Sequence, residues 1–361
     1  MADVDGDDGG GKDADGPVPI GVKLGSTRTV LAYPDGDGSI ETARTLTCLA
    51  TYEDPTTGDE QVLYGDEAAQ QYPEAVEFML RSGLPEDERR AELVGQFFEE
   101  LCENHDLPPE SGVVYAIPTI GDEQGLANLN AVLEESAIGH AFVRSLPESL
   151  CGSLPAMGEG MDAIDETFVA VNLGATSLES CAYHQGEQLA PFVSRAVTGN
   201  DVDSRIANTI EEETQGRVTI DTTTAREYKE THADFDSFEP VTDTIQQPGG
   251  GSHEFTIERS VMEPLDEYLD SVVDELANNF LSQLASAYMK PYQLALSRPL
   301  VVTGGMACIP GIVDEFEDRL CDELGRDVTV VTADRPDLAA AQGAHRIASQ
   351  LVDLSCVPDA R

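Results

Sequence analysis

The sequence predicts an α/β fold made of two related domains, and three observations support this. Short apolar runs typical of buried strands alternate with segments whose apolar residues recur at helical spacing. A strand, a glycine turn and a second strand occur twice, around Gly25 and around Gly174. The 361 residues are enough for two domains with separate cores. Such alternation favours largely parallel sheets covered on both faces, so a ligand would lie in the crevice between the halves.

The first half begins with a predicted hairpin and continues as alternating strands and helices. Apolar positions in residues 89–104 recur at helical spacing, and the buried strand at 112–117 ends at Pro118. The expected strands are 19–24, 29–33, 46–52, 61–64, 112–117 and 142–146, and the expected helices are 89–104 and 122–136. A glycine-rich hinge is expected at residues 152–160.

The second half repeats this order. The expected strands are 168–173, 178–183, 189–196, 300–303 and 328–332, and the expected helices are 200–213, 223–233, 260–287, 312–324 and 336–351. The middle of the 260–287 helix is a candidate point for a break, and residues 235–251 are expected to form a polar loop with a glycine hairpin tip.

These elements suggest where the domains begin and end. The first domain is expected at 17–155, with a small lobe at about 45–80, and the second at 156–335, with a small lobe at about 200–258. Residues 336–361 are expected to form a helix that packs back on the first domain, followed by a tail.

Three glycine turns have the features that a nucleotide requires. Phosphate groups bind backbone N–H groups, and only small residues let the backbone approach closely. The first turn contains Gly25, Ser26, Thr27 and Arg28, the second Gly174, Ala175, Thr176 and Ser177, and the third Gly304, Gly305, Met306 and Ala307. The third offers flat backbone for an adenine or ribose. A single Gly-Gly turn is more often structural, but three such turns, each after an aliphatic strand, predict a nucleotide site.

The charge pattern indicates the environment in which the protein works. The formal net charge is −47, and only four of the 21 basic residues are lysines (Lys12, Lys23, Lys229 and Lys290). An acidic, lysine-poor surface is typical of proteins that stay soluble in molar salt, where the Debye length is about 3 Å. We therefore expect a halophilic, archaeal source. Periodic apolar segments disfavour the alternative of a disordered acidic linker, and such a surface would repel nucleic acid and anionic membranes.

The remaining composition favours a cytoplasmic protein. Residues 1–16 are rich in Asp and Gly and are expected to be a disordered leader. No apolar stretch approaches the roughly 18 residues needed to span a bilayer, and the N-terminus lacks a signal-peptide core. The seven cysteines show no CxxC pair and are expected to be reduced thiols.

These motifs resemble those of the superfamily that contains actin, Hsp70 and the sugar kinases, and are most similar to the bacterial rod-shape actins. The most specific match is the run TGGMACIPG at 303–311, and further matches occur at 63–68, 116–118, 198–203 and 224–230. The resemblance implies a duplicated, ribonuclease H-like fold that binds ATP between its halves and assembles head to tail. It also implies that Glu227, Lys229 and Glu230 contact the ribose and adenine. The chain is similar as well to haloarchaeal actins of the salactin and volactin kind, and the motifs assign it to neither.

Two positions depart from the family pattern. The resemblance places Lys23 and Asn172 where aspartates normally hold magnesium through water. We hypothesise that Lys23 is a built-in cation, so that nucleotide binds with little or no divalent metal. The alternative is that Lys23 extends to solvent beside a degenerate cleft. The resemblance places the family's water-activating residue near Gln124 or Gly125, of which Gln124 is the weak catalytic candidate, and no residue is assigned as a metal ligand.

The sequence therefore leaves two functions open. The first is an actin-like, ATP-binding protein, a weak ATPase at most, that forms filaments for cell shape or intracellular organisation. The second is a non-hydrolysing pseudo-ATPase that acts as a regulatory or scaffold module. A kinase is disfavoured because no catalytic aspartate base is evident.

Overall fold

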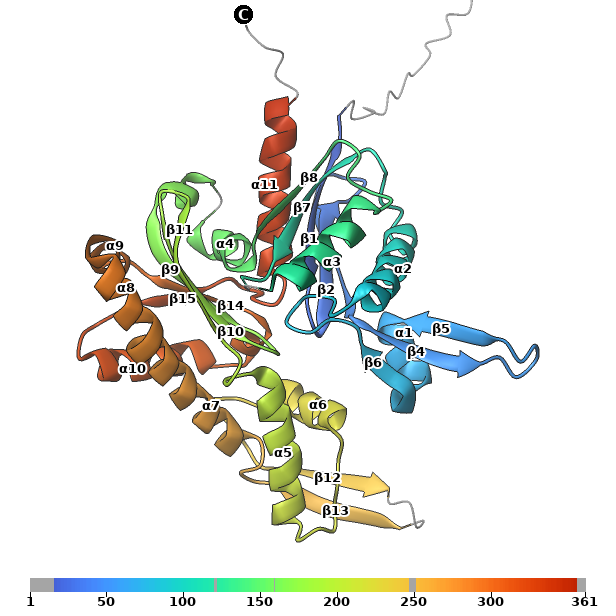
Figure 1. The fold of residues 1–361 in the computed structure, drawn as a ribbon. Coiled ribbons are helices and arrows are strands. Elements are labelled where there is room, and N and C mark those ends of the chain that lie inside the picture. Colours follow the sequence, from blue (N-terminus) through green and yellow to red (C-terminus); the bar gives the residue numbers. More distant parts are fainter. Residues whose placement is uncertain (1–15, 120–121, 159, 247–250, 356–361) are drawn as a thin grey trace, which may run out of the picture.

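The computed structural model describes residues 16–119, 122–158, 160–246 and 251–355. Apart from Gly16, the predicted acidic leader lies outside these residues, as does most of the predicted glycine hairpin tip. Figure 1 shows two halves, each built on a twisted five-stranded sheet.

The two large sheets have the same topology. The first has the order β3 (Ile40–Leu46), β2 (Arg28–Pro34), β1 (Val18–Leu24), β7 (Ser111–Ile117) and β8 (Phe142–Pro147). The second has the order β11 (Glu187–Ser194), β10 (Leu178–His184), β9 (Thr167–Leu173), β14 (Leu300–Thr303) and β15 (Val330–Thr332). In both, the first three strands pair antiparallel, and the third begins a run of parallel pairs. The predicted duplicated α/β arrangement is thus present.

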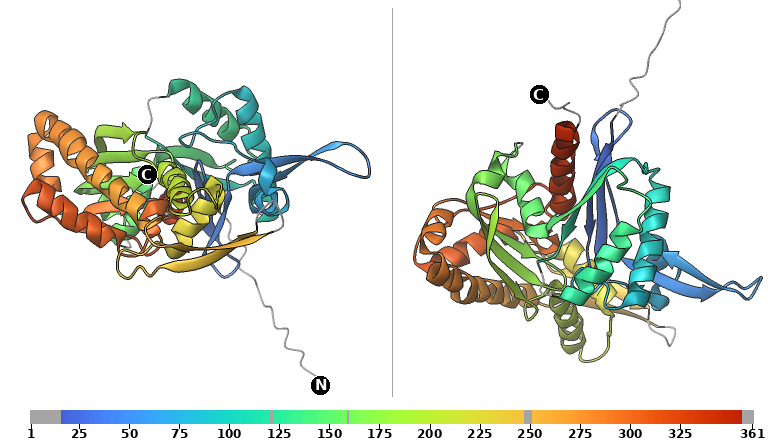
Figure 2. Two further views of the ribbon diagram at one scale, coloured as in Figure 1. Left: turned by 90° about the horizontal axis from the view of Figure 1, so that it is seen from below. Right: turned by 45° about the horizontal axis from the view of Figure 1, so that its top comes forward.

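Helices cover both faces of the first sheet. Apolar side chains of α2 (Glu88–Asn104) and α3 (Glu123–Glu134) form one core with β1 and β7. On the opposite face lies α11 (Ala339–Ser355), although it comes from the end of the chain. In Figures 1 and 2 this helix, coloured red, lies beside the first sheet. It packs so closely on β1 that a Cβ atom at Gly21 would lie 2.1 Å from the carbonyl oxygen of Ala341.

The second sheet is covered by a long helical rod and two further helices. The rod consists of α7 (Met262–Asp274), a π-helical turn (Glu275–Leu281) and α8 (Ser282–Ala287), and α9 (Met289–Ala295) follows it. Together with α10 (Ile312–Leu324), the rod encloses the largest apolar core. On the opposite face, α4 (Glu148–Ser153) connects the halves and contacts β9, β14 and α11.

Each half also carries a smaller lobe near the cleft. In the first half, β5 (Glu60–Tyr64), β4 (Cys48–Glu53) and β6 (Val76–Phe78) form a sheet beside α1 (Gly65–Gln71). In the second, α5 (Gly199–Glu213) and α6 (Thr222–His232) share an apolar core with the hairpin of β12 (Val241–Gln246) and β13 (Ser252–Ile257), and Tyr228 of α6 donates a hydrogen bond to Asp243 of β12. These elements fall within the predicted small lobes, and the exact domain limits stay a prediction.

Several segments differ from the expectation, among them four that bear on the architecture. The predicted hinge at 152–160 was wrong in its first part, because α4 and a 3₁₀ turn (Leu154–Met157) occupy residues 148–157 and all six residues of α4 are buried. Strand β3 was missed because it contains no buried residue. Strand β12 lies where a polar loop was expected, and α9 was not anticipated. The break in the 260–287 helix is the π-helical turn.

Within the described ranges, no helix is long and apolar enough to cross a membrane. The six cysteines there form no disulfide, and four of them are buried.

Candidate functional site

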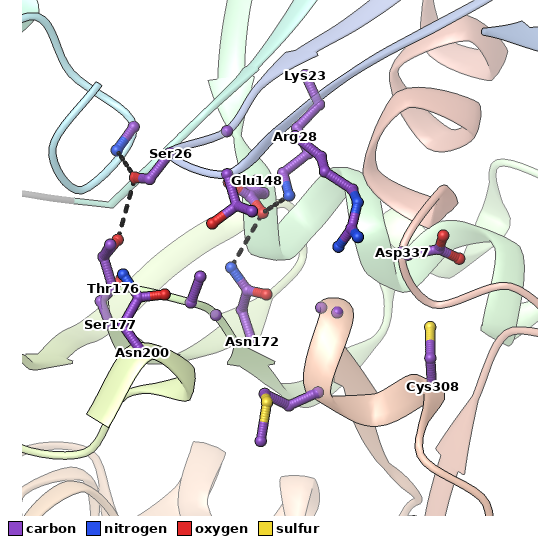
Figure 3. A pocket seen from close by; sticks show the side chains of 18 of the residues that line it. Lys23, Ser26, Arg28, Glu148, Asn172, Thr176, Ser177, Asn200, Cys308 and Asp337 are labelled. Carbon is purple, nitrogen blue, oxygen red and sulfur yellow. Dashed lines mark hydrogen bonds and ion pairs between the residues drawn. The ribbon is translucent and has the colours of Figure 1, made fainter. Parts of the chain in front are cut away.

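A cavity of about 340 Å³ lies between the two halves and is lined by residues of all three glycine turns (Figure 3). Fifteen of the predicted binding residues line it: Lys23, Gly25, Ser26, Thr27, Arg28, Asn172, Gly174, Ala175, Thr176, Ser177, Lys229, Glu230, Gly304, Gly305 and Met306. Residues about 280 positions apart in the sequence therefore meet around one cavity, as the turn pattern predicts.

Three predicted site residues do not line this cavity. Gln124 is exposed in the first turn of α3, and its side-chain amide donates a hydrogen bond to Asn128 Oδ1 at 2.9 Å. Glu227 is exposed on α6 because a residue two positions before Lys229 projects from nearly the opposite side of the helix. Ala307 is buried in the core of the second half.

The first two turns have the same backbone geometry. The amide of Gly25 donates to the carbonyl of Arg28 at 3.2 Å, and the amide of Gly174 donates to the carbonyl of Ser177 at 3.0 Å. A Cβ atom would lie 2.6 Å from the acceptor oxygen at Gly25 and 2.8 Å from it at Gly174, so both positions require glycine.

A direct hydrogen bond joins the two turns across the cleft. The hydroxyl oxygens of Ser26 and Thr176 are 3.1 Å apart, and Ser26 Oγ also accepts from the amide of Gly83 at 2.6 Å. Figure 3 shows these groups facing one another between the halves. The turns are therefore held close enough to contact one ligand together.

The third turn approaches the second at backbone distance. Gly304 has φ +98°, a conformation that side chains of L-residues rarely adopt. A Cβ atom there would lie 2.4 Å from the carbonyl oxygen of Leu173 and 2.5 Å from Asn172 Oδ1. The glycine therefore allows the third turn to close the floor of the cavity beside Asn172.

Lys23 and Asn172 converge on a single carboxylate oxygen (Figure 3). Glu148 Oε1 lies 3.2 Å from Lys23 Nζ and accepts a hydrogen bond from Asn172 Nδ2 at 3.1 Å. Lys23 and Glu148 both line the cavity. Lys23 thus points into the cleft and not to solvent, and in this structure its charge is balanced by Glu148.

Glu179 is a second buried carboxyl group in the cavity wall. It accepts hydrogen bonds from the backbone amide of Thr119 at 2.9 Å and from Ser177 Oγ at 3.1 Å. Burial, reinforced by the nearby charge of Glu148, raises the pKa of Glu179 to about 7. At neutral pH the cavity therefore contains a carboxyl group that is protonated in part of the molecules.

The wall contributed by α5 and α6 is organised around Asp203. This side chain is buried, and its oxygens lie 2.5 Å from Lys229 Nζ and 3.2 Å from Arg226 Nε. Lys229 also donates to the carbonyl of Gly199 at 3.3 Å. Burial lowers the pKa of Lys229, and Asp203 opposes that effect. Lys229 is thus fixed by its partners and forms part of a rigid wall.

Three further ion pairs border the cavity. Arg28 of the first half donates to both carboxylate oxygens of Glu230 in the second half, at 2.8 and 2.7 Å. Burial alone would raise the pKa of Glu230, but the Arg28 guanidinium holds it below its ordinary value. Asp337 accepts from Arg44 at 2.6 Å and from Arg335 at 3.0 Å. The first pair bridges the two halves directly.

The formal charge of the residues that line the cavity is opposite in sign to the net charge of the chain. Among the residues that the structure describes, its lining includes six of the 21 basic residues (Lys23, Arg28, Arg44, Arg226, Lys229 and Arg335). It includes only five of the 68 acidic residues (Glu148, Glu179, Asp203, Glu230 and Asp337). The lining thus has a formal charge of +1 in a chain of −47, which favours an anionic ligand.

Sequence reasoning missed thirteen lining residues. They are Arg44, Ser82, Gly83, Pro118, Glu148, Glu179, Asn200, Asp203, Arg226, Cys308, Ile309, Arg335 and Asp337. Arg226 and Asp203 lie in the runs at 224–230 and 198–203 that carried the resemblance, so the signal was present there. No feature of the sequence distinguished Glu148 or Glu179 from the many other acidic residues of the chain.

Lys23 and Asn172 do not supply the two carboxylates that the resemblance implies for a magnesium site. The position that would face a hydrated cation holds the ammonium group of Lys23, and the amide nitrogen of Asn172 points at the same carboxylate oxygen. No cluster of three or more His, Cys, Asp or Glu side chains suited to a metal ion occurs in the described part of the chain.

Comparison with known proteins identifies the family. The family model described as Salactin matches residues 17–352. The chain is 59% identical to Salactin of Halobacterium salinarum over 360 residues, which cover 98% of this chain and 99% of that protein. The chain belongs to the Salactin family. The expectation of a haloarchaeal, actin-like protein is thereby confirmed.

Solved structures place this Salactin-family member in the actin fold. The MamK double helical filament matches with a TM-score of 0.73 and 17% identity, covering 92% of this chain and 99% of that one. MreB5 of Spiroplasma citri bound to ADP matches with a TM-score of 0.71 and 16% identity, covering 94% and 99%. At these identities the likeness shows the fold, and the predicted fold class is confirmed.

Proposed function

We propose that this Salactin-family protein is a cytoplasmic, adenine-nucleotide-binding cytoskeletal protein that assembles into head-to-tail filaments in concentrated salt. The observation that carries the proposal is the charge reversal around the cavity, where a strongly acidic chain gathers six basic side chains beside two facing glycine turns. Structural neighbours support the choice of ligand, since MreB5 is described in complexes with ADP and AMPPNP.

Different parts of the cavity lining suit the phosphates, the ribose and the base of a nucleotide. The backbone around Gly25 and Gly174 suits phosphates, because small residues leave the amides accessible. Lys23 would contribute a point charge to the polyphosphate once it exchanges Glu148 for a phosphate oxygen. The turn at Gly304 and Gly305 and the rigid wall around Lys229 would border the ribose and base.

The site favours binding with little or no divalent metal. Lys23 already supplies a cation where a hydrated metal ion would otherwise be held. Calorimetric titration of ATP in EDTA and in magnesium tests this, and we expect similar affinities in the two buffers. Binding that occurs only with magnesium would contradict it.

Filament assembly is the second part of the proposal. MamK is described as a double helical filament and, in another structure, as a non-polymerising mutant bound to AMPPNP. A head-to-tail contact between different faces does not close and so builds an open polymer. Sedimentation in molar KCl with and without ATP tests it. Persistent monomers across salt and nucleotide conditions would refute it.

A non-hydrolysing pseudo-ATPase is a second candidate, favoured by the position of Gln124. The one predicted water-orienting side chain is exposed and bonded to Asn128, away from the cavity. This candidate predicts that phosphate release stays at background while ATP still raises the thermal midpoint. Release well above background would favour a weak ATPase instead.

A further inference from the structure

Two carboxyl groups and one ammonium group are buried together beside the glycine turns. Glu148 is 8% exposed and Glu179 2%, and both line the cavity. They are here called the carboxyl pair. Lys23 Nζ lies 3.2 Å from Glu148 Oε1 (Figure 3), and among the described residues Glu179 forms no ion pair. Lys23 therefore balances one carboxylate only, and the three groups have a net charge of −1 when both carboxyl groups are ionised.

Among the described residues, the elements packed around the carboxyl pair supply no second ion-pair partner to it. On β9, Asn172 is a neutral amide. On α4, burial raises the pKa of the Cys151 thiol, so the thiol is neutral. On α11, which packs on α4 and β1, Arg346 donates to the carbonyl of Leu154. Burial lowers the pKa of His345 on the same helix, so its imidazole is neutral at pH 7 and above. The other charged residues of the cavity lining pair with one another.

Glu179 binds and releases its proton near neutral pH. Burial raises its pKa most, and the charge of Glu148 adds to that effect. The hydrogen bonds from Thr119 and Ser177 oppose it, as does the charge of Lys23. The resulting pKa is about 7, so a change in the surrounding charge decides whether the proton is bound.

The carboxyl pair lies directly behind the turns that suit phosphates. Ser177 of the second turn donates to Glu179 at 3.1 Å, and Lys23 Nζ lies 3.2 Å from the place of a Cβ atom at Gly25 in the first turn. A polyphosphate held by these turns would therefore bring several negative charges close to the pair. A nearby like charge raises the pKa of a carboxyl group, and salt screens such buried interactions only weakly.

Displacement of Lys23 acts in the same direction. When Lys23 exchanges Glu148 for a phosphate oxygen, Glu148 loses its one ion-pair partner among the described residues and still faces the charge of Glu179. Two carboxyl groups that share a site without a cation do not both stay ionised, and the pair retains a proton to a much higher pH. The phosphate charge and the loss of Lys23 thus both favour the singly protonated pair.

We propose that the cavity binds a nucleotide together with one proton, which the carboxyl pair takes up from solvent. The proton forms an O–H bond with a carboxylate oxygen of the pair, and no other covalent bond changes. Lys23 and this proton then offset part of the phosphate charge. The inference rests on the proposed nucleotide binding and specifies the protonation state of the occupied site.

The proposal fixes how affinity depends on pH. The nucleotide and the proton raise each other's affinity by the same factor, because coupling between two bound species is reciprocal. Above about pH 7 the free site has lost its proton and must take one up when the nucleotide binds. The dissociation constant for ATP should therefore increase as the pH rises, by up to about tenfold per pH unit.

Calorimetry counts the proton directly. ATP is titrated into the protein at about pH 8 in molar KCl and EDTA, once in HEPES and once in Tris, because these buffers differ in their enthalpies of ionisation. The slope of the observed binding enthalpy against the ionisation enthalpy gives the number of protons taken up. We expect about 0.5–1 proton per ATP for the wild type.

Isosteric variants locate the proton. Glu179→Gln keeps both contacts of the side chain, since its oxygen can accept from the Thr119 amide and its NH₂ group can donate to Ser177 Oγ. It should lower the uptake by about twofold or more. The double variant Glu148→Gln/Glu179→Gln should leave only the protons that ATP itself gains or loses. Glu187→Gln, at the exposed start of β11, is the matched control and should equal the wild type.

Infrared difference spectroscopy gives a readout that does not depend on affinity. At about pH 8, where the free pair is largely ionised, saturating ATP should produce a carboxylic-acid C=O band in the wild type and in Glu187→Gln. The band should shift in D₂O and be absent from the double variant. This measurement decides the question even where a variant binds ATP too weakly for calorimetry.

The outcomes separate this inference from the proposed function. If the wild type binds ATP with equal enthalpies in the two buffers and gains no acid band, the inference is overturned, while nucleotide binding stands. If the double variant takes up as many protons as the wild type, the proton is bound elsewhere and the inference is again overturned. If ATP binds at no pH, the proposed function is refuted together with the inference.

Discussion

The two halves present the same backbone and opposite chemistry to the cavity. Lys23 pairs with Val30 across β1 and β2, and at the matching place Asn172 pairs with Glu179 across β9 and β10. The first half thus supplies a cation next to a buried valine, and the second a neutral amide next to a buried carboxyl group. The duplicated fold fixes where these side chains lie, and the identity of each side chain sets the charge that a ligand meets.

A second difference concerns what covers the sheets. At the centre of β1, Gly21 lies under α11 with no space for a Cβ atom, whereas the matching residue of β9 is the buried Ala170. The first half therefore depends on a close backbone contact, and the second on ordinary side-chain packing.

The largest expected effect tests this packing difference. Gly21→Ala should destabilise the protein by about 3 kcal/mol, because its Cβ atom would overlap backbone atoms of α11 that cannot move separately. The matched change Ala170→Gly should cost only about 1 kcal/mol. Thermal unfolding in concentrated KCl measures both. Equal losses would show that the two halves are packed alike.

The next effect tests the chemical difference at the turns. Lys23→Gln should weaken ATP binding in EDTA by about 2 kcal/mol, roughly thirtyfold, because a charged partner is lost and Glu148 then faces the phosphates unpaired. The double variant Lys23→Gln/Glu148→Gln should recover part of that loss. Lys290→Gln, outside the cavity, is the matched lysine control. Unchanged calorimetric affinity for Lys23→Gln would refute the built-in cation.

A smaller effect concerns the bond between the turns. Ser26→Ala removes the acceptor of the Gly83 amide and the contact with Thr176, and should cost about 1 kcal/mol of stability. Thr176→Val removes only the second contact and should cost about half as much. The second half has Ala175 at the position that matches Ser26, so only the first half supplies a serine that also accepts from a neighbouring backbone amide. Equal thermal shifts for the two variants would contradict this asymmetry.

The smallest effect is a pH dependence from Glu179. Its folded-state pKa of about 7 lies above the ordinary value of 4.5, so the folded protein holds this proton more tightly than the unfolded chain. The resulting stabilisation is complete below the ordinary pKa and is lost as the pH rises through about 7. Wild type should therefore lose thermal stability relative to Glu179→Gln between about pH 5 and pH 8. The exposed control Glu187→Gln should track wild type, and parallel curves for all three would contradict the assignment.

The sequence predicted the elements that depend on local patterns. The strand–glycine–strand turns and α10 were anticipated, since periodicity and glycine spacing are local signals. Helix α4 and strand β3 were not, because α4 forms where two sheets enclose it and β3 is an exposed edge strand.

Among the charged residues of the site, only those of a type that is rare in the chain could be predicted from the sequence. With four lysines in the chain, Lys23 and Lys229 stood out, and both line the cavity. With 68 acidic residues, nothing in the sequence distinguished Glu148 or Glu179 from solvent-exposed carboxylates. Gln124 does not line the cavity, and its assignment depended on a resemblance with a one-residue ambiguity and not on its own surroundings.

The packing of α11 on β1 has a consequence for synthesis. The strand is among the first described residues to leave the ribosome, and the helix that covers it is among the last. At about 5–20 residues per second, the roughly 200 residues between the end of the first half and α11 take tens of seconds to translate. During that time one face of the nascent sheet has no cover, so we expect chaperones to bind it, and a prematurely terminated chain to be degraded.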